Sequence, residues 1–343
     1  MNKWNRRCRQ YGRAAPVEKT LVGVCVLRMD SSRAAPPADC ARACVKPLSR
    51  IFLRDGALTV GVAPDCGGAL TRFDVRVGET PVDILRQAID GTERSVCALG
   101  TSCFPLVPYG GRLRGGRFSF GGRPYRFPLN ALPERHSSHG DGWTRPWDLV
   151  HLDRRTAVMS LEADVDAPLR YSCTQTVAVG ADRLRITLSV RNVGPQSVPM
   201  GLGLHPYFAD RNRARVTANL PIHWRWDAEL MPVDTERNPL ADAFCKGTDV
   251  AGLPVAAEYA GWDGSATIEW PDRRVRVELE TIPRLRHVVM WVPRGESFFC
   301  FEPICHATDA LNPYPDHPAA EDFLVLEPND TFEQCFDFQV SIL

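Results

Sequence analysis

The stretch Leu184-Arg185-Ile186-Thr187-Leu188-Ser189-Val190-Arg191 alternates apolar and polar residues at every step. Because successive side chains of a β-strand point to opposite faces, this alternation predicts a strand with one buried and one solvated face. The same period recurs at residues 57–62, 275–279 and 336–342. The strand period therefore dominates from about residue 57 to the end of the sequence.

Two continuous apolar runs, His287–Val292 and Phe298–Phe301, predict strands that are buried on both faces. Gly121-Gly122 separates two short strand-like segments and predicts a hairpin turn. An amphipathic helix of three turns is almost absent, and 28 prolines disfavour long helices. Many short strands with turn residues between them predict an all-β fold, an antiparallel sandwich or barrel.

The first fifty residues differ in composition from the rest of the 343-residue chain. They contain eleven Lys and Arg against Glu18, Asp30 and Asp39, and they show no period. We expect residues 1–50 to form a basic, disordered extension and residues 51–343 to form one domain. The apolar run at 21–27 starts late and lacks a close Ala-x-Ala pattern, so we do not expect an export signal.

The formal net charge is zero, so no charge pattern favours binding to nucleic acid or to a membrane surface. No segment approaches the roughly 20 apolar residues of a membrane span. None of the twelve cysteines forms a Cys-x-x-Cys pair, and we interpret most of them as small buried residues. These features predict a cytoplasmic protein, and we expect a monomer or weak dimer.

Polar donors, glycines and two tryptophans crowd into the segment Arg135–Trp147, which includes His139 and Trp143. Tryptophan faces stack on the C–H face of a sugar ring, while histidine and arginine bind its hydroxyls. The segment therefore favours a sugar site. The structural alternative is a surface loop whose tryptophans hold it against the core.

His205 and Glu302 are the two other candidates for chemistry. His205 follows an apolar, glycine-spaced run and can exchange protons near neutral pH, although such a histidine can equally be a satisfied core residue. Glu302 ends the apolar run 298–301, where a carboxylate is costly unless it is paired or used. The alternative for Glu302 is a strand-end position facing water.

A metal site could in principle use His139, His205, Cys305 and His306. However, the sequence has neither a His-Glu-x-x-His motif nor cysteine and histidine pairs at zinc-finger spacing. Serine-hydrolase, P-loop and dinucleotide-binding motifs are also missing from the sequence. We therefore expect no metal and no cofactor.

Taken together, these motifs resemble those of the aldose 1-epimerase (galactose mutarotase-like) superfamily, in its less characterised branch. The similarity runs from about residue 51 to residue 343. The segments that carry it, in family order, are Gly67–Leu70, Phe104–Leu113, Gly115–Phe118, Phe127–Asn130, His139-Gly140, Leu204–Phe208, Phe301–Pro303 with Asp309–Asn312, and Glu327–Phe332.

The resemblance implies a large antiparallel β supersandwich and an enzyme that interconverts the α and β anomers of a free monosaccharide. It implies that Glu302 takes the proton from the anomeric hydroxyl and that His205 protonates the ring oxygen. It implies that Arg112 and His139 bind the sugar, with Tyr207 nearby. From the composition of the Arg135–Trp147 segment we expect Trp147 to bind the sugar as well.

The sequence departs from the family pattern at two places. Ala256 stands where galactose mutarotases carry a sugar-binding aspartate, and Gly111 replaces an asparagine. Two alternatives follow. One is a non-catalytic carbohydrate-binding protein on the same fold. The other is a hexose-6-phosphate 1-epimerase, for which Arg112, Arg114 and Arg117 would have to converge on the site.

Overall fold

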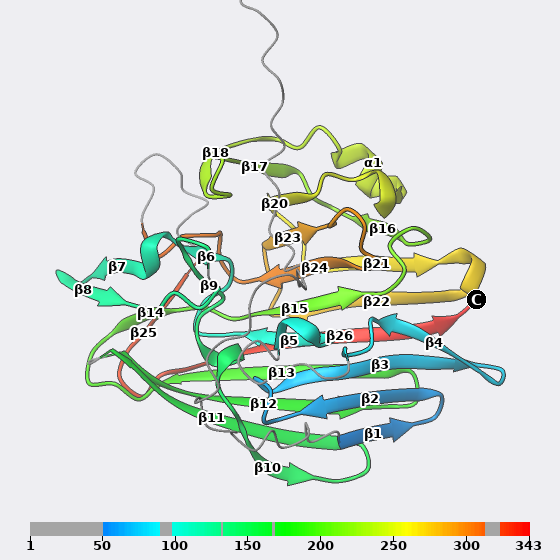
Figure 1. Ribbon diagram of the computed structural model, residues 1–343, viewed down its shortest axis with the longest axis horizontal. Coiled ribbons are helices and arrows are strands. Elements are labelled where there is room, and N and C mark those ends of the chain that lie inside the picture. Colours follow the sequence, from blue (N-terminus) through cyan, green and yellow to red (C-terminus); the bar gives the residue numbers. More distant parts are fainter. Residues whose placement is uncertain (1–50, 90–97, 132, 167–168, 313–322) are drawn as a thin grey trace, which may run out of the picture. The chain divides into compact units, whose positions relative to one another are not determined.

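The computed structural model describes residues 51–89, 98–131, 133–166, 169–312 and 323–343 (Figure 1). The predicted extension at residues 1–50 lies outside the described residues. Within them, the chain folds into two large antiparallel sheets and three small two-stranded ones. No helix of the described part is both long enough and apolar enough to cross a membrane.

The larger sheet has eleven strands, and β5 (Cys103–Leu106) pairs with both β3 and β15. Its remaining strands, in spatial order, are β1 (Ile51–Asp55), β2 (Leu58–Ala63), β3 (Ala69–Val77), β4 (Thr80–Leu85), β15 (Gly203–Phe208), β24 (Phe299–Ile304), β23 (His287–Trp291), β20 (Ala256–Ala260), β17 (Ile222–Trp226) and β18 (Pro232–Arg237).

The second sheet has nine strands, and β26 (Thr331–Ile342) lies near its middle, between β13 and β22. The others, in spatial order and without β26, are β10 (Asp148–Leu152), β11 (Thr156–Asp166), β12 (Leu169–Val179), β13 (Arg183–Asn192), β22 (Val275–Ile282), β21 (Ser265–Trp270), β16 (Arg215–Ala218) and β19 (Thr248–Asp249).

Short elements decorate the two sheets. The small strand pairs are β6 (Arg112–Leu113) with β9 (Ser137–Ser138), β7 (Arg117–Phe120) with β8 (Arg123–Arg126), and β14 (Val198–Met200) with β25 (Leu324–Leu326). The helices described are α1 (Ala241–Lys246) and the 3₁₀ turns η2 (Arg114–Gly116), η3 (Gly142–Thr144), η4 (Val250–Gly252) and η5 (Pro271–Arg273).

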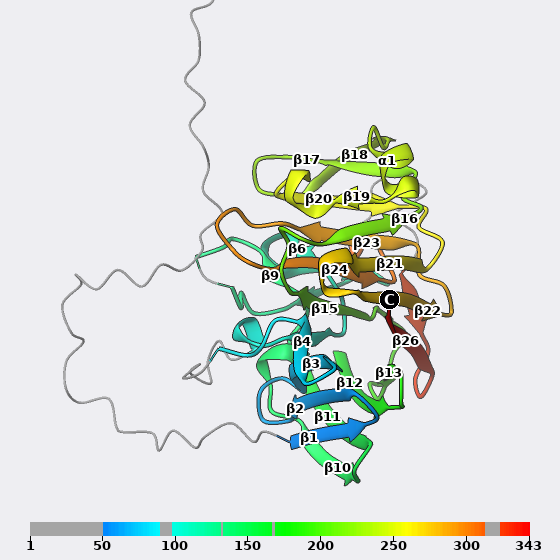
Figure 2. The same ribbon diagram turned by 90° about the vertical axis from the view of Figure 1, so that its right-hand side faces the viewer.

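The two large sheets pack face to face on one main core, which Figure 2 shows as two layers. The ring of Phe73 on β3 meets that of Phe338 on β26 edge-on at 6.2 Å. The ring of Phe208 on β15 lies 6.4 Å from that of Trp270 on β21. Removal of these aromatic faces from water is the main force holding the layers together. The predicted all-β antiparallel sandwich is confirmed.

Part of the outer face of the larger sheet is buried as well, under a second apolar cluster. Phe301 on β24 belongs to the main core, so its neighbour Glu302 points to the opposite, outer face. On the outer face a smaller cluster gathers Phe104, Trp143 and Tyr207. The loops that carry β6 and β9 lie on this side of β24, away from β22 (Figure 2). The predicted burial on both faces is correct for β24, whereas Val289 and Trp291 on the outer face of β23 are only half-buried.

The cysteines follow the prediction in part. Six described cysteines carry no disulfide, and four of these are buried: Cys103, Cys173, Cys300 and Cys305. Cys66 differs from the expectation because it is disulfide-bonded.

Candidate active site

The register of β15 and β24 brings His205 beside Glu302. Gly203 pairs with Ile304 and Tyr207 pairs with Cys300, so His205 and Glu302 lie opposite each other between these two pairs. The Nε2 atom of His205 lies 3.3 Å from Oε1 of Glu302, and their side chains are only 7% and 3% exposed. Two proton-exchanging groups are therefore in direct contact on the outer face of the sheet.

His139 completes the cluster from the loop that follows β9. Its backbone N–H donates to the carbonyl oxygen of Gly111, and the N–H of Gly111 donates to its Nδ1 atom at 3.2 Å. The His139 ring stands edge-on to that of His205, with centroids 5.2 Å apart. One side-chain atom each of His139, His205 and Glu302 lie within 4.8 Å of one another. The structure thus brings together three predicted residues that are far apart in the sequence.

Aromatic rings fix the orientation of the His205 imidazole. The Phe104 and Tyr207 rings each stack on it at 4.6 Å between centroids. The guanidinium group of Arg86 lies 3.6 Å from the centroid of the Tyr207 ring, a cation–π contact. These contacts leave the imidazole little freedom to rotate, which keeps Nε2 directed at Glu302.

Two buried polar atoms of the pair have no hydrogen-bond partner, namely Nδ1 of His205 and Oε2 of Glu302. A buried polar atom without a partner costs about 1–3 kcal/mol. Proteins accept such a cost mainly where a ligand or water supplies the missing bond. A polar ligand or a water molecule would supply the missing bonds.

Burial dominates the electrostatics of the pair. It raises the pKa of Glu302 to about 8, an effect that Arg112 opposes and Glu258 reinforces. It lowers the pKa of His205 well below its usual value, and the neighbouring His139 and Arg86 lower it further. Without a ligand, the pair therefore favours a protonated carboxyl group beside a neutral imidazole.

His139 is a neutral hydrogen-bond donor. Burial and the charge of Arg112 lower its pKa to about 3, so the ring is uncharged near neutral pH. Since Nδ1 accepts a hydrogen bond from Gly111, the ring hydrogen resides on Nε2. A metal-binding histidine instead directs its second nitrogen, as a donor, to a carboxylate or carbonyl. The Gly111 contact therefore disfavours a metal on Nε2 of His139.

Of the other two predicted binding residues, Arg112 lies near the cluster and Trp147 lies in the main core. Arg112 forms an ion pair with Glu134 at 3.2 Å and influences the pKa values of both His139 and Glu302. Trp147 packs in the main core and its indole N–H donates to the carbonyl oxygen of Gly142. The tryptophan that shares the outer cluster with Tyr207 is Trp143, whose ring stacks on Phe104 at 5.5 Å.

Sequence reasoning overlooked Glu258. It lies on β20, is fully buried, and pairs with Val289, which in turn pairs with Glu302. Its signal in the sequence was a carboxylate between Ala257 and Tyr259 in an apolar segment, the same signal that singled out Glu302.

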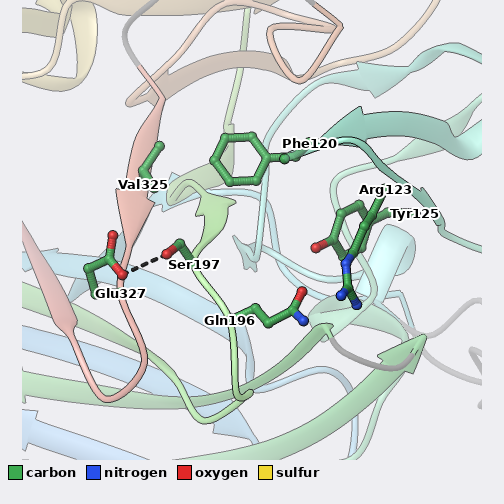
Figure 3. A pocket seen from close by; sticks show the side chains of 8 residues that line it. Phe120, Arg123, Tyr125, Gln196, Ser197, Val325 and Glu327 are labelled. Atoms are coloured by element: carbon green, nitrogen blue, oxygen red, sulfur yellow. Dashed lines mark hydrogen bonds between the residues drawn. The ribbon is translucent and has the colours of Figure 1, made fainter.

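Two cavities of the described part of the chain are lined by residues outside the cluster. A cavity of about 380 Å³ lies between the β7–β8 hairpin and the β14–β25 pair, and its lining includes Phe120, Arg123 and Glu327 (Figure 3). It shares no lining residue with the His139, His205 and Glu302 cluster. A second cavity, of about 510 Å³, is lined in part by Arg86, which touches the ring of Tyr207.

Comparison with known proteins identifies the family. The model of the family described as aldose 1-epimerase matches residues 49–339. The chain belongs to the aldose 1-epimerase family. One relative is the uncharacterised protein YphB of Escherichia coli (strain K12). It is 32% identical to this chain over 300 residues, which cover 81% of this chain and 94% of YphB.

Solved structures agree with this assignment. The crystal structure of a candidate aldose 1-epimerase from Escherichia coli K12 matches with a TM-score of 0.77 and 29% identity, over 86% of this chain and 100% of that chain. A galactose mutarotase-like protein from Clostridium acetobutylicum matches with a TM-score of 0.74 and 18% identity, over 87% and 99% of the two chains. The second similarity concerns the fold alone.

Proposed function

We propose that this member of the aldose 1-epimerase family interconverts the α and β anomers of a free aldose by acid–base ring opening. The observation that carries the proposal is the contact of His205 with Glu302 at 3.3 Å, in which each residue keeps one buried atom without a partner. A sugar that approaches the pair brings its anomeric hydroxyl to Glu302 and its ring oxygen to Nε2 of His205.

The reaction conserves the number of protons on the pair. Opening the hemiacetal removes the proton from O1 and adds a proton to O5, while the C1–O5 bond breaks and C1 becomes an aldehyde. Rotation about the C1–C2 bond then presents the other face of the aldehyde, and the reverse transfers close the ring with the inverted anomer. One shared proton is sufficient for both directions.

Glu302 acts as the base for O1 and His205 as the acid for O5. Burial favours the neutral pair in the free site, so transfer of the proton from Glu302 to Nε2 of His205 precedes or accompanies ring opening. The positive charge of Arg112 favours this transfer because it stabilises the Glu302 carboxylate. His139 donates its Nε2–H to a sugar oxygen, and Tyr207 holds the imidazole of His205.

The placement of the arginines favours an unphosphorylated sugar over a hexose phosphate. Arg112 is paired with Glu134, and Arg114 contacts the carboxylates of Asp309 at 3.4 Å and Asp227 at 3.9 Å. Arg117 is exposed on β7. A phosphate group would have to compete with these carboxylates, because the charges of Arg112 and Arg114 are already compensated by them.

The test is exchange NMR of freshly dissolved anomers over a panel of aldoses and aldose phosphates, carried out in the presence of EDTA. We expect accelerated exchange of at least one free aldose. Glu302→Gln should reduce that rate by about 10²–10⁴-fold or more, since glutamine cannot accept the O1 proton. Binding of sugars without any accelerated exchange would favour the non-catalytic carbohydrate-binding alternative instead.

A further inference from the structure

A row of three side chains crosses the outer face of the larger sheet, from β20 to β24. Glu258 pairs with Val289, and Val289 pairs with Glu302. Directly paired residues of antiparallel strands point to the same face of a sheet, so two carboxyl groups flank Val289. Since neighbouring strands lie about 4.8 Å apart, the backbones of Glu258 and Glu302 are about 10 Å apart.

Glu258 is a preorganised hydrogen-bond acceptor. Its Oε1 atom accepts from the backbone N–H of Thr308 at 2.8 Å, and its Oε2 atom accepts from the indole N–H of Trp226 at 3.2 Å. Both groups that make these bonds are donors, so the Glu258 oxygens act as acceptors, and burial raises the pKa of this carboxyl group above its usual value. Carboxylate oxygens offer about four acceptor positions in all, so capacity for a further donor remains.

The order of residues along the row gives the direction of a bound ring. The proposed function places O5 at His205 and O1 at Glu302, and Glu258 lies beyond Glu302 on the side away from His205. In an aldopyranose, C2 follows C1, and C3 lies across the ring from O5. The hydroxyl groups on C2 and C3 therefore point toward Glu258.

The span of the row suits a single sugar ring. Two hydrogen bonds of about 2.8 Å, one at each carboxyl group, together with the ring between them fill the separation of about 10 Å. Val289, between the two carboxyl groups, is partly exposed and offers an apolar surface to the C–H groups of the ring. A polar contact at each end and an apolar contact between them match the alternating surface of a pyranose.

We propose that Glu258 is a specificity-determining residue that accepts hydrogen bonds from the C2 and C3 hydroxyl groups of the aldose. The proposal rests on the proposed function for the direction of the ring. It also accounts for the small residue at Ala256, since Glu258 lies two positions along the same face of β20 and supplies a carboxylate from there. A buried acceptor of this kind rejects analogues that lack its hydroxyl partner.

A purely structural role is the competing explanation, because Glu258 also anchors Thr308 and Trp226. The two roles differ in what a substitution does to different sugars. Loss of an anchor weakens catalysis on all sugars alike. Loss of a hydroxyl acceptor removes the discrimination between a sugar and its deoxy derivative.

The experiment measures kcat/KM by exchange NMR for the preferred aldose and for its 2-deoxy, 3-deoxy and 4-deoxy derivatives. The parent should lose about tenfold to a hundredfold on the 2-deoxy or 3-deoxy sugar, because removal of the hydroxyl leaves a buried acceptor unpaired, and much less on the 4-deoxy sugar. In Glu258→Gln the penalty for the 2-deoxy or 3-deoxy sugar should shrink severalfold. Glu280→Gln, an exposed residue of β22, should behave as the parent does.

Two results overturn the proposal: equal losses of Glu258→Gln on all four sugars, or a parent that tolerates removal of both hydroxyls. If Glu258→Gln does not fold, Glu258→Asp keeps the charge and should alter the same penalty. If the parent accelerates no exchange, the proposed function fails by itself. Glu258 is then judged by tryptophan-fluorescence titration of the parent with the same sugars, where equal dissociation constants contradict its role.

Discussion

Gly111 and His139 hold each other by two reciprocal hydrogen bonds. The N–H of Gly111 donates to Nδ1 of His139 at 3.2 Å, and the N–H of His139 donates to the carbonyl oxygen of Gly111 at 2.8 Å. Gly111 thus controls the tautomer of a site histidine through its backbone. Because Gly111 makes both bonds with its own backbone atoms, no side chain at residue 111 is needed to fix the tautomer.

The fixed tautomer predicts the behaviour of His139 variants. Glutamine places an N–H near the position of Nε2, whereas alanine removes the donor. We expect His139→Gln to raise KM a few-fold with kcat largely kept, and His139→Ala to lower kcat/KM by about tenfold, the value of a typical neutral hydrogen bond left unmade. Steady-state exchange kinetics separate the two parameters. An equal, complete loss in both variants would assign His139 to proton transfer instead.

The pH–rate profile should have its alkaline limb near pH 8. The raised pKa of Glu302, about 8, marks where the free site releases the proton that the pair shares. Above that pH neither group can protonate O5, so kcat/KM should fall with rising pH. The lowered pKa of His205 places the acid limb below its ordinary value. An alkaline limb that persists unchanged in Glu302→Gln would contradict this origin.

The two catalytic substitutions should not be additive. His205→Asn removes the proton donor for O5, so its loss should be of the same order as that of Glu302→Gln, about 10²–10⁴-fold. Since both groups act in one ring opening, the double variant should be little worse than either single variant. The measurement is exchange NMR on all four proteins. Multiplied losses would indicate that the two residues act in separate steps.

Gly140 should be sensitive to a single methyl group. Its φ of +66° favours glycine, and an added Cβ would lie 2.1 Å from the carbonyl oxygen of Val107. Gly78 has a similar φ of +60° but open space around that position. Gly140→Ala should therefore lower the melting temperature by several degrees more than Gly78→Ala, and it should also reduce activity because His139 precedes it. Equal melting temperatures would contradict this reasoning.

Local patterns in the sequence were sufficient to predict several of the strands. The alternation at residues 184–191 became part of β13. In that range the apolar residues are buried and the polar residues are exposed or half-buried. A solvated face is specified by residues that are neighbours in the sequence, so a local pattern can predict it. The hairpin at Gly121-Gly122 also formed as predicted, between β7 and β8. The order of strands within the sheets could not be predicted, since it depends on contacts between residues far apart in the chain.

The candidate site was predictable where a polar residue broke an apolar strand, as at Glu302. It was not predictable where the choice lay between two similar residues of one loop. Trp143 and Trp147 have the same chemistry, and only the path of the loop places one in the outer cluster and the other in the main core. Phe104 gave no signal of its own, because its contact with His205 arises from the pairing of β5 with β15.

The central place of β26 in the second sheet has a consequence for synthesis of the protein. Residues 331–342 join β13 to β22, so the two parts of that sheet stay unconnected until this segment has left the ribosome. Until then, β13 and β22 each expose an edge that can pair with other chains. Newly made chains should therefore depend on chaperone protection until residues 331–342 have been made and can pair.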